Sequence, residues 1–315
     1  MKLGFLYAGQ GSQHPGMGAD LYEAFPTFRQ VIDQANVDFD IKEVSFTDAE
    51  NKLNQTRYTQ PCMVAFAAGL TAVLKEKGIV PDLAAGLSLG EYSALHAAGV
   101  FDAQTAIELV AFRGKAMEQA AEGVKSAMVA VLGLERDKLQ QACEQAADCG
   151  VVVIANYNCP GQLVIGGEKA AVDKAVLLAK EAGAKRCMPL KVSGPFHTPL
   201  MQPAGKALEE RFQEIKFQTP AIPVVFNCLG DVKSEENSIP ELLVRQVQSS
   251  VFMEDSIRKM VELGADILVE IGPGKALSGF ARKTVPNVPI FAVETVADVE
   301  KLVETLEQMK KEKNG

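Results

Sequence analysis

One short segment, PDLAAGLSLGEYSAL from Pro81 to Leu95, restricts the possible folds more than any other part of the chain. Small and apolar residues lead up to Ser88, which has Gly86 and Gly90 two residues away on either side, and a good helix former follows. A short buried strand, a tight turn with serine at its tip and a helix together form a nucleophile elbow. The alternative is a tight turn that carries a serine by chance.

The hydrophobic pattern on both sides of this segment predicts an α/β fold. We expect buried strands over 3–8, 82–87, 223–227 and 266–272, and helices over 60–78, 102–122 and 297–310. Between residues 126 and 192 the predicted elements follow the order βαββαβ of a ferredoxin-like unit. The sequence therefore predicts a small ferredoxin-like subdomain, 126–192, inserted in a larger α/β subdomain made of 1–125 and 193–315.

Composition excludes several other classes of protein. The formal net charge of −8 over 315 residues argues against general binding to nucleic acid. No apolar run reaches the roughly 18 residues that a membrane span needs. The six cysteines include no CxxC pair, so we expect neither a metal site nor a disulfide framework. Reduced thiols in a cytoplasmic protein are the simplest interpretation.

A serine nucleophile needs a base, and the chain has three histidines. His96 follows Ser88 on the same predicted helix, about two turns further along, and is expected to point away from the elbow. His14 lies in a glycine-rich loop, 9–18, and could lie near the site. His197 lies where the chain leaves the small subdomain and re-enters the large one. Elimination favours His197; the alternative is a histidine that caps the helix beginning near Pro199.

Two glycine-rich segments invite a nucleotide-binding interpretation, and both fail it. In GQGSQHPGMG, residues 9–18, the third glycine of the dinucleotide fingerprint is replaced by His14. In IGPGKALSG, residues 271–279, the spacing of a P-loop and its Ser or Thr are missing. The first loop is better explained as a source of backbone amides beside Ser88. The amides of Gln10 and Leu89 are then the candidate donors to an oxyanion.

These motifs, taken together, resemble those of the malonyl-CoA:acyl carrier protein transacylases of bacterial type II fatty acid synthesis. The resemblance covers nearly the whole chain in order, in the segments GQGSQHPGMG, GLSLGEYSAL, AFRGKAM, NCPGQLVIGG, GAKRCMPLKVSGPFHTPLM, LVRQ and VEIGPGKALSG. It implies a large subdomain similar to the α/β-hydrolase core and a small ferredoxin-like one, with the active site between them. The chain departs from the family at Leu87, where histidine is usual, and at Ala8, where proline is usual.

The resemblance also implies a role for each residue of the site. Ser88 is the nucleophile, His197 its base, and the backbone carbonyl of Gln246 orients the histidine. Arg113 holds the free carboxylate of the substrate. The backbone amides form the oxyanion hole and two further side chains line the acyl pocket; these four residues are Gln10, Leu89, Met117 and Phe196.

The implied reaction moves a malonyl group from malonyl-CoA to the phosphopantetheine thiol of acyl carrier protein, through an O-malonyl serine and without a cofactor. The expected partners are therefore malonyl-CoA and a carrier protein, with no nucleic acid and no membrane. We expect the carrier to dock on the basic residues that precede the site, Lys185, Arg186 and Lys191. The alternatives are a trans-acting acyltransferase of a polyketide synthase, a serine esterase or thioesterase, and a non-catalytic binding module.

Overall fold

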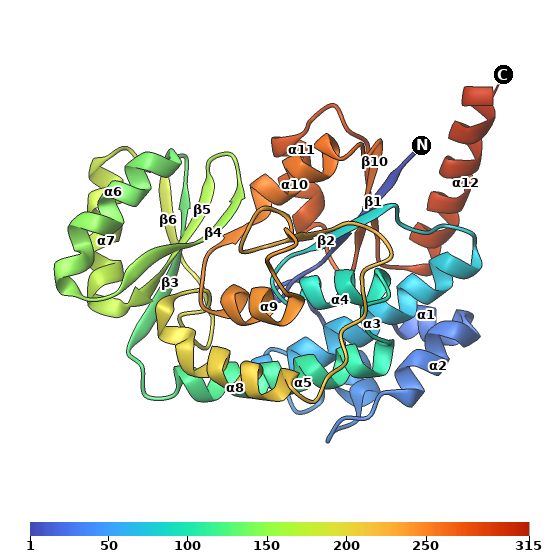
Figure 1. Cartoon of the computed structure of the whole chain (residues 1–315), viewed down its shortest axis with the longest axis horizontal. Coiled ribbons are helices and arrows are strands. Elements are labelled where there is room, and N and C mark those ends of the chain that lie inside the picture. The colour runs from blue at the N-terminus through green and yellow to red at the C-terminus, as the bar shows by residue number, and fades with distance from the viewer. Residues whose placement is uncertain (315) are drawn as a thin grey trace.

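The computed structural model describes residues 1–314 and contains two β-sheets that lie side by side (Figure 1). The first sheet is parallel except at one edge and has the strand order β11-β10-β1-β2-β7-β8. Its central strands β1 and β10 are buried along their whole length, as parallel strands covered on both faces should be. The bounds are β1 Leu3–Tyr7, β2 Leu83–Gly86, β7 Val224–Phe226, β8 Asp231–Val232, β10 Ile267–Ile271 and β11 Ile290–Val293.

The second sheet has the strand order β6-β3-β5-β4-β9. Its first four strands come from the region that the sequence predicts as βαββαβ, and that element order is present. The bounds are β3 Ser126–Leu132, α6 Arg136–Ala146, β4 Val152–Cys159, β5 Gln162–Glu168, α7 Lys169–Glu181 and β6 Arg186–Pro189. Strand β9, Val251–Phe252, was not predicted; it comes from a distant part of the chain and pairs in parallel with β4.

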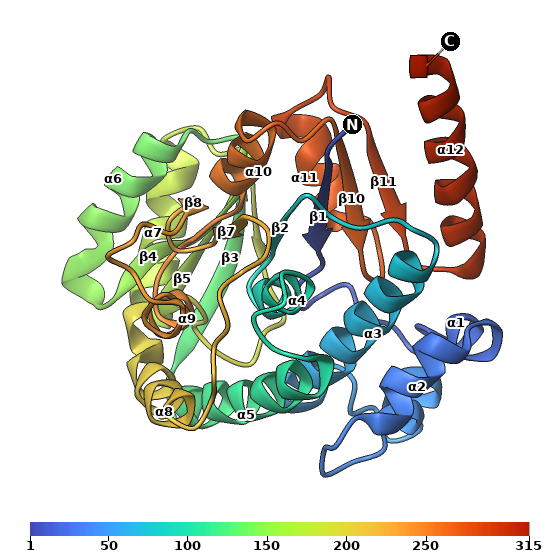
Figure 2. The ribbon, with the colours of Figure 1, turned by 45° about the vertical axis from the view of Figure 1, so that its right-hand side comes forward.

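Helices pack around the first sheet: α4 contacts β1 and β2, and α3 and α5 pack against α4 and against each other (Figure 2). Helix α5 begins where the sequence predicts, because the Asp102 carboxylate accepts a 2.7 Å hydrogen bond from the Thr105 amide. Helix α3 begins four residues earlier than predicted, so that Pro61 lies inside it. The bounds are α1 Ala19–Ala24, α2 Pro26–Gln34, α3 Thr56–Glu76, α4 Gly90–Ala97, α5 Ala103–Ala121, α8 Gln202–Phe212, α9 Ile239–Val247, α10 Met253–Glu262, α11 Ala276–Thr284 and α12 Val296–Asn314.

The closing helix α12 lies at one side of the molecule (Figures 1 and 2). Its apolar stripe is buried at Val299, Leu302 and Leu306, as the spacing of these residues predicts. Across residues 1–314, no helix is long and apolar enough to cross a membrane.

Candidate active site

The turn between β2 and α4 has the geometry of a nucleophile elbow. Ser88 has a φ of +54°, a left-handed conformation that costs free energy for any residue other than glycine. The flanking glycines are required because the backbones approach very closely. A Cβ on Gly86 would lie 2.0 Å from the carbonyl carbon of Gly90, and one on Gly90 would lie 2.3 Å from the Tyr7 oxygen. The packing therefore allows no side chain at either position.

The fold brings Ser88 and His197, which are 109 residues apart in the sequence, into hydrogen-bond contact. The serine Oγ lies 2.7 Å from Nε2 of the histidine, whose Nδ1 lies 2.9 Å from the backbone oxygen of Gln246. A carbonyl oxygen can only accept, so Nδ1 carries the hydrogen and Nε2 is free to accept the serine proton. His197 also has a positive φ of +60° and is only 4% exposed. The arrangement therefore contains a serine, a base and an orienting carbonyl.

The environment keeps His197 neutral. Burial first, and then the nearby positive charge of Arg113, lower the pKa of this imidazole to about 4. Near pH 7 the ring is therefore unprotonated and able to take a proton.

Arg113, on α5, lies fully buried beside the serine. Its guanidinium donates to Ser88 Oγ at 3.1 Å, to Gln60 Oε1 at 2.9 Å and to Gln246 Oε1 at 3.0 Å. Burial lowers the pKa of Arg113, but a guanidinium keeps its proton in proteins. Its Nε has no hydrogen-bond partner among the described residues. The site thus holds a positive charge within reach of any acyl group attached to Ser88.

The two candidate oxyanion donors lie at the ends of adjacent parallel strands. Gln10 follows β1, and Leu89 follows Ser88 at the start of α4. Among residues 1–314, neither backbone amide donates a hydrogen bond. The amide of Ser88 itself is engaged, because it donates to Asn227 Oδ1 at 2.7 Å. Of these three amides, those of Gln10 and Leu89 are therefore free to donate to a ligand at the elbow.

Two residues that the sequence analysis missed brace this turn. Asn227, directly after β7, accepts from the Ser88 amide and donates through Nδ2 to the Gly86 oxygen at 2.6 Å. Its backbone amide donates to Glu91 Oε2 at 2.5 Å. Glu91 is completely buried, and burial raises its pKa to about 8. The only signal in the sequence was a polar residue placed directly after a buried strand.

The other predicted residues fall in different places. Met117 lies one turn beyond Arg113 on α5 and is buried, with its sulfur 3.3 Å from Gln60 Nε2. Phe196, beside His197, is 7% exposed.

The two histidines that were not chosen as the base have other partners. His14 is exposed and pairs with the Glu294 carboxylate, and His96 contacts the Phe101 carbonyl oxygen at 3.1 Å. Neither of these rings hydrogen-bonds to Ser88, and His96 points away from the elbow, as its position two helical turns past Ser88 predicts.

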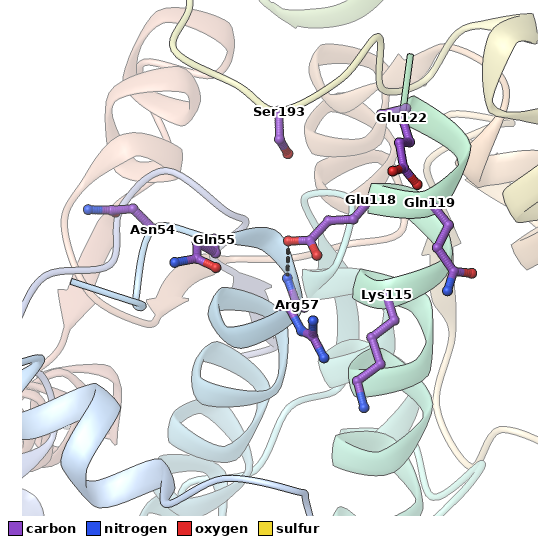
Figure 3. A pocket seen from close by; sticks show the side chains of 9 residues that line it. Asn54, Gln55, Arg57, Lys115, Glu118, Gln119, Glu122 and Ser193 are labelled. Carbon is purple, nitrogen blue, oxygen red and sulfur yellow. Dashed lines mark hydrogen bonds between the residues drawn. The ribbon is translucent and has the colours of Figure 1, made fainter. Parts of the chain in front are cut away.

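A pocket of about 490 Å³ opens between the start of α3 and the end of α5 (Figure 3). Arg57 and Lys115 supply cations there, and the Glu118 carboxylate accepts from the Arg57 backbone amide at 3.0 Å. At its edge the Ser193 hydroxyl lies 2.9 Å from that of Thr56. Ser88 does not line this pocket, so the pocket does not include the elbow serine.

The basic residues preceding His197 are on the surface. Lys185, Arg186 and Lys191 are all exposed, on and beside the edge strand β6. Large apolar side chains are exposed in the same stretch, since Met188, Leu190 and Val192 are 42%, 38% and 41% exposed. This surface therefore combines positive charge with apolar area.

The fold and the elbow correspond to one class of enzyme. The model of the acyl transferase domain family matches residues 4–314, which makes the chain an acyltransferase. Within that class it belongs to the family of malonyl CoA-acyl carrier protein transacylases. It is 40% identical over 311 residues to the malonyl CoA-acyl carrier protein transacylase of Bacillus subtilis, covering 98% of each chain.

Solved structures agree with this assignment. The malonyl CoA-acyl carrier protein transacylase of Clostridium perfringens superposes with a TM-score of 0.96 at 39% identity, over 100% of both chains. A second match is the structure of a type II PKS acyl-carrier protein in complex with its malonyl-transacylase. It has a TM-score of 0.93 and 39% identity, and covers 97% of this chain and 100% of that one.

Proposed function

We propose that this enzyme transfers the malonyl group of malonyl-CoA to the phosphopantetheine thiol of acyl carrier protein, and so supplies fatty acid biosynthesis. The observation that carries the proposal is the contact of one hydroxyl, Ser88 Oγ, with both a neutral imidazole and a buried guanidinium. The first group activates the serine for acyl transfer. The second selects an acyl group that carries a carboxylate.

The first half-reaction acylates Ser88. His197 Nε2 takes the hydroxyl proton while Oγ attacks the thioester carbonyl, and the amides of Gln10 and Leu89 hold the resulting oxyanion. Each such donor is worth roughly 3–4 kcal/mol in the transition state. The carbon–sulfur bond then breaks, and the CoA sulfur leaves with the proton from His197. The Gln246 carbonyl keeps the ring oriented throughout.

The second half-reaction reverses these steps with another thiol. The phosphopantetheine thiol gives its proton to His197 and attacks the O-malonyl serine, and the serine oxygen leaves with that proton. The kinetics should therefore be ping-pong, and the transfer reversible. Every proton and electron pair moves between Ser88, His197, the thioester and the thiol, so the proposed chemistry uses no cofactor.

Arg113 is the proposed carboxylate-binding residue. It contacts Ser88 Oγ, and the malonyl carboxylate lies only two bonds beyond the ester carbonyl carbon, within reach of the same guanidinium. Two parallel hydrogen bonds between guanidinium and carboxylate are a strong and selective contact. Buried Phe196 and Met117 are proposed to limit the size of the acyl group.

Two measurements test this function. Intact mass spectrometry after brief exposure to malonyl-CoA should show a malonyl adduct that Ser88→Ala abolishes. An adduct that persists in that variant, on a cysteine for example, would refute the mechanism. In Arg113→Ala, kcat/KM should fall for malonyl-CoA and hold or rise for acetyl-CoA. A wild-type malonyl-to-acetyl ratio in Arg113→Ala would show that the arginine is a bystander.

The proposed docking surface for the carrier is the exposed basic and apolar stretch that leads to His197. Charge reversal at Lys185, Arg186 and Lys191 should raise KM for the carrier and weaken its salt dependence, without changing acylation by malonyl-CoA. Equal kinetics in the wild type and the triple variant would refute this location. A polyketide-synthase carrier is the second candidate acceptor, favoured by the match to a transacylase in complex with such a carrier.

We also infer that the two sheets mark two subdomains. The large one, 1–125 and 193–315, is α/β-hydrolase-like, and the small one, 126–192, is ferredoxin-like. The strand order β6-β3-β5-β4 supports the second assignment. Strand β9 belongs to the large subdomain and pairs with β4 of the small one, so the second sheet contains strands from both subdomains. A cytoplasmic location stays a prediction.

A further inference from the structure

The positive charge of Arg113 is held entirely by neutral groups. Its two terminal nitrogens donate to amide oxygens, those of Gln60 and Gln246, and to the serine hydroxyl. Among the described residues, no carboxylate lies within salt-bridge distance of this guanidinium. A buried charge is normally paired, so this arrangement leaves one negative charge to be supplied from outside.

The nearby buried acid does not supply that charge. The Glu91 carboxylate accepts from the Asn227 backbone amide at 2.5 Å, and burial raises its pKa to about 8. Burial therefore favours the neutral, protonated form of Glu91, which makes no ion pair with Arg113 among the described residues. His197 is neutral as well, so the buried groups around Ser88 carry a net positive charge.

Both glutamines are fixed with their oxygens toward the guanidinium. Gln60, on α3, is 1% exposed, and its Nε2 donates to the Met117 sulfur at 3.3 Å. Gln246 is completely buried, and its Nε2 donates to the backbone oxygen of Ser88 at 2.8 Å. With each NH₂ group engaged elsewhere, each amide oxygen is left to accept from Arg113. The two side chains position the guanidinium without neutralising it.

We propose that Gln60 is a specificity-determining residue, because a neutral acceptor at its position leaves the Arg113 charge available to the acyl carboxylate. A glutamate of nearly the same shape would accept the same hydrogen bond and bring an internal counter-ion. The site would then hold no uncompensated charge, and an incoming malonyl carboxylate would meet a like charge. This inference rests on the proposed role of Arg113 as the carboxylate-binding residue.

The test compares Gln60→Glu with the uncharged control Gln60→Met, using kcat/KM for malonyl-CoA, acetyl-CoA and malonamyl-CoA, the neutral amide analogue of malonyl-CoA. In Gln60→Glu, malonyl transfer should fall about 100-fold, because the acyl carboxylate would lose its charge contact with Arg113. Acetyl and malonamyl transfer should change by less than about fivefold, which is within the range of a lost neutral hydrogen bond. Gln60→Met should lower all three together and keep the preference for malonyl.

Phenylmethylsulfonyl fluoride, a small neutral reagent for activated serines, checks that the elbow is intact in each variant. Labelling of Ser88 at a rate near that of the wild type shows that Ser88 and His197 are undisturbed. A Gln60→Glu enzyme that keeps the wild-type malonyl-to-acetyl ratio overturns the inference. So does a Gln60→Met enzyme that loses the ratio as fully as Gln60→Glu does, because shape and not charge would then decide.

Arg113→Ala separates this inference from the proposed function. If Arg113→Ala loses malonyl preference and Gln60→Glu keeps it, only the role of Gln60 is wrong. If Arg113→Ala keeps the preference, the proposed carboxylate site is wrong and the role of Gln60 is overturned with it.

Discussion

Replacing Asn227 by alanine should impair acylation of Ser88, although Asn227 does not touch the reacting atoms. Its side chain accepts from the Ser88 amide at 2.7 Å and donates to the Gly86 oxygen at 2.6 Å, one on each side of the turn. These bonds hold Ser88 at a φ of +54°, a conformation that a serine does not adopt without support.

The size of the effect follows from those two contacts. Asn227 is completely buried, so Asn227→Ala leaves a backbone donor and a backbone acceptor without partners. Each buried backbone group without a hydrogen-bond partner costs about 1–3 kcal/mol, which gives about 2–6 kcal/mol for the two groups. Part of this will appear as lower stability, and the rest as relaxation of Ser88 away from its strained φ. A displacement near 1 Å is enough to cost about 100-fold in rate.

The assay is single-turnover acylation by malonyl-CoA, followed by intact mass, together with thermal unfolding. Asn227→Ala should lower the maximal acylation rate about 100-fold and change half-saturation by malonyl-CoA little, because Arg113 is untouched. The control is Asn36→Ala, an exposed asparagine whose side chain bonds to Glu108 at 3.2 Å. If Asn227→Ala loses thermal stability and still acylates as fast as the control, Asn227 is structural only and this reasoning is wrong.

Three further predictions follow from the site. His197→Ala should lower transfer at least about 100-fold, the usual scale for a general base, whereas His14→Ala and His96→Ala should cost little; a dead His96→Ala enzyme would contradict the assignment. The unfolded chain loses the Glu91 proton near pH 4.5 and the folded chain only near pH 8, so Glu91 should make stability fall as pH rises between these values. Calorimetry should show that Glu91→Gln flattens this fall, and an unchanged slope would argue against a buried neutral acid. Leu87→His should stay active in a transfer assay, because residue 87 is absent from the contacts around Ser88 Oγ; an inactive variant would show otherwise.

Local chemistry made part of the site predictable from sequence. The elbow could be found because its glycines are required by backbone contacts within a few residues of Ser88 and with β1. His197 could be found by elimination among three histidines. Arg113 could not be found from the residues alone, since an arginine on a helix is usually exposed. Its burial depends on α3 and α9, which supply Gln60 and Gln246, and only the family resemblance pointed to it.

Long-range contacts account for what was missed. The brace around the elbow joins Asn227, after β7, to Glu91 on α4, more than 130 residues away in sequence, and no local pattern links them. Strand β9 has two residues and exists only because β4 presents an open edge to it. By contrast, the βαββαβ order and the stripe of α12 depend on periodicities that the sequence displays directly.

The final prediction concerns how the substrate changes its own base. Burial and, after it, the Arg113 charge together lower the pKa of His197 to about 4. A malonyl carboxylate on Arg113 compensates that charge, so the pKa of His197 should rise toward its ordinary value once malonyl-CoA is bound. Protonated His197 cannot accept the Ser88 proton, so acylation is lost as pH falls through this pKa.

Single-turnover acylation measured from pH 4 to 8 separates the two states. At limiting malonyl-CoA, the fall of the acylation rate at low pH, its acid limb, reports the pKa of His197 in the free enzyme. At saturating malonyl-CoA, it reports the pKa of His197 in the complex. The second limb should lie at higher pH than the first. With acetyl-CoA, which brings no carboxylate, the two limbs should coincide. If the two limbs coincide with malonyl-CoA as well, its carboxylate does not reach Arg113, and the charge of the substrate does not change the pKa of His197.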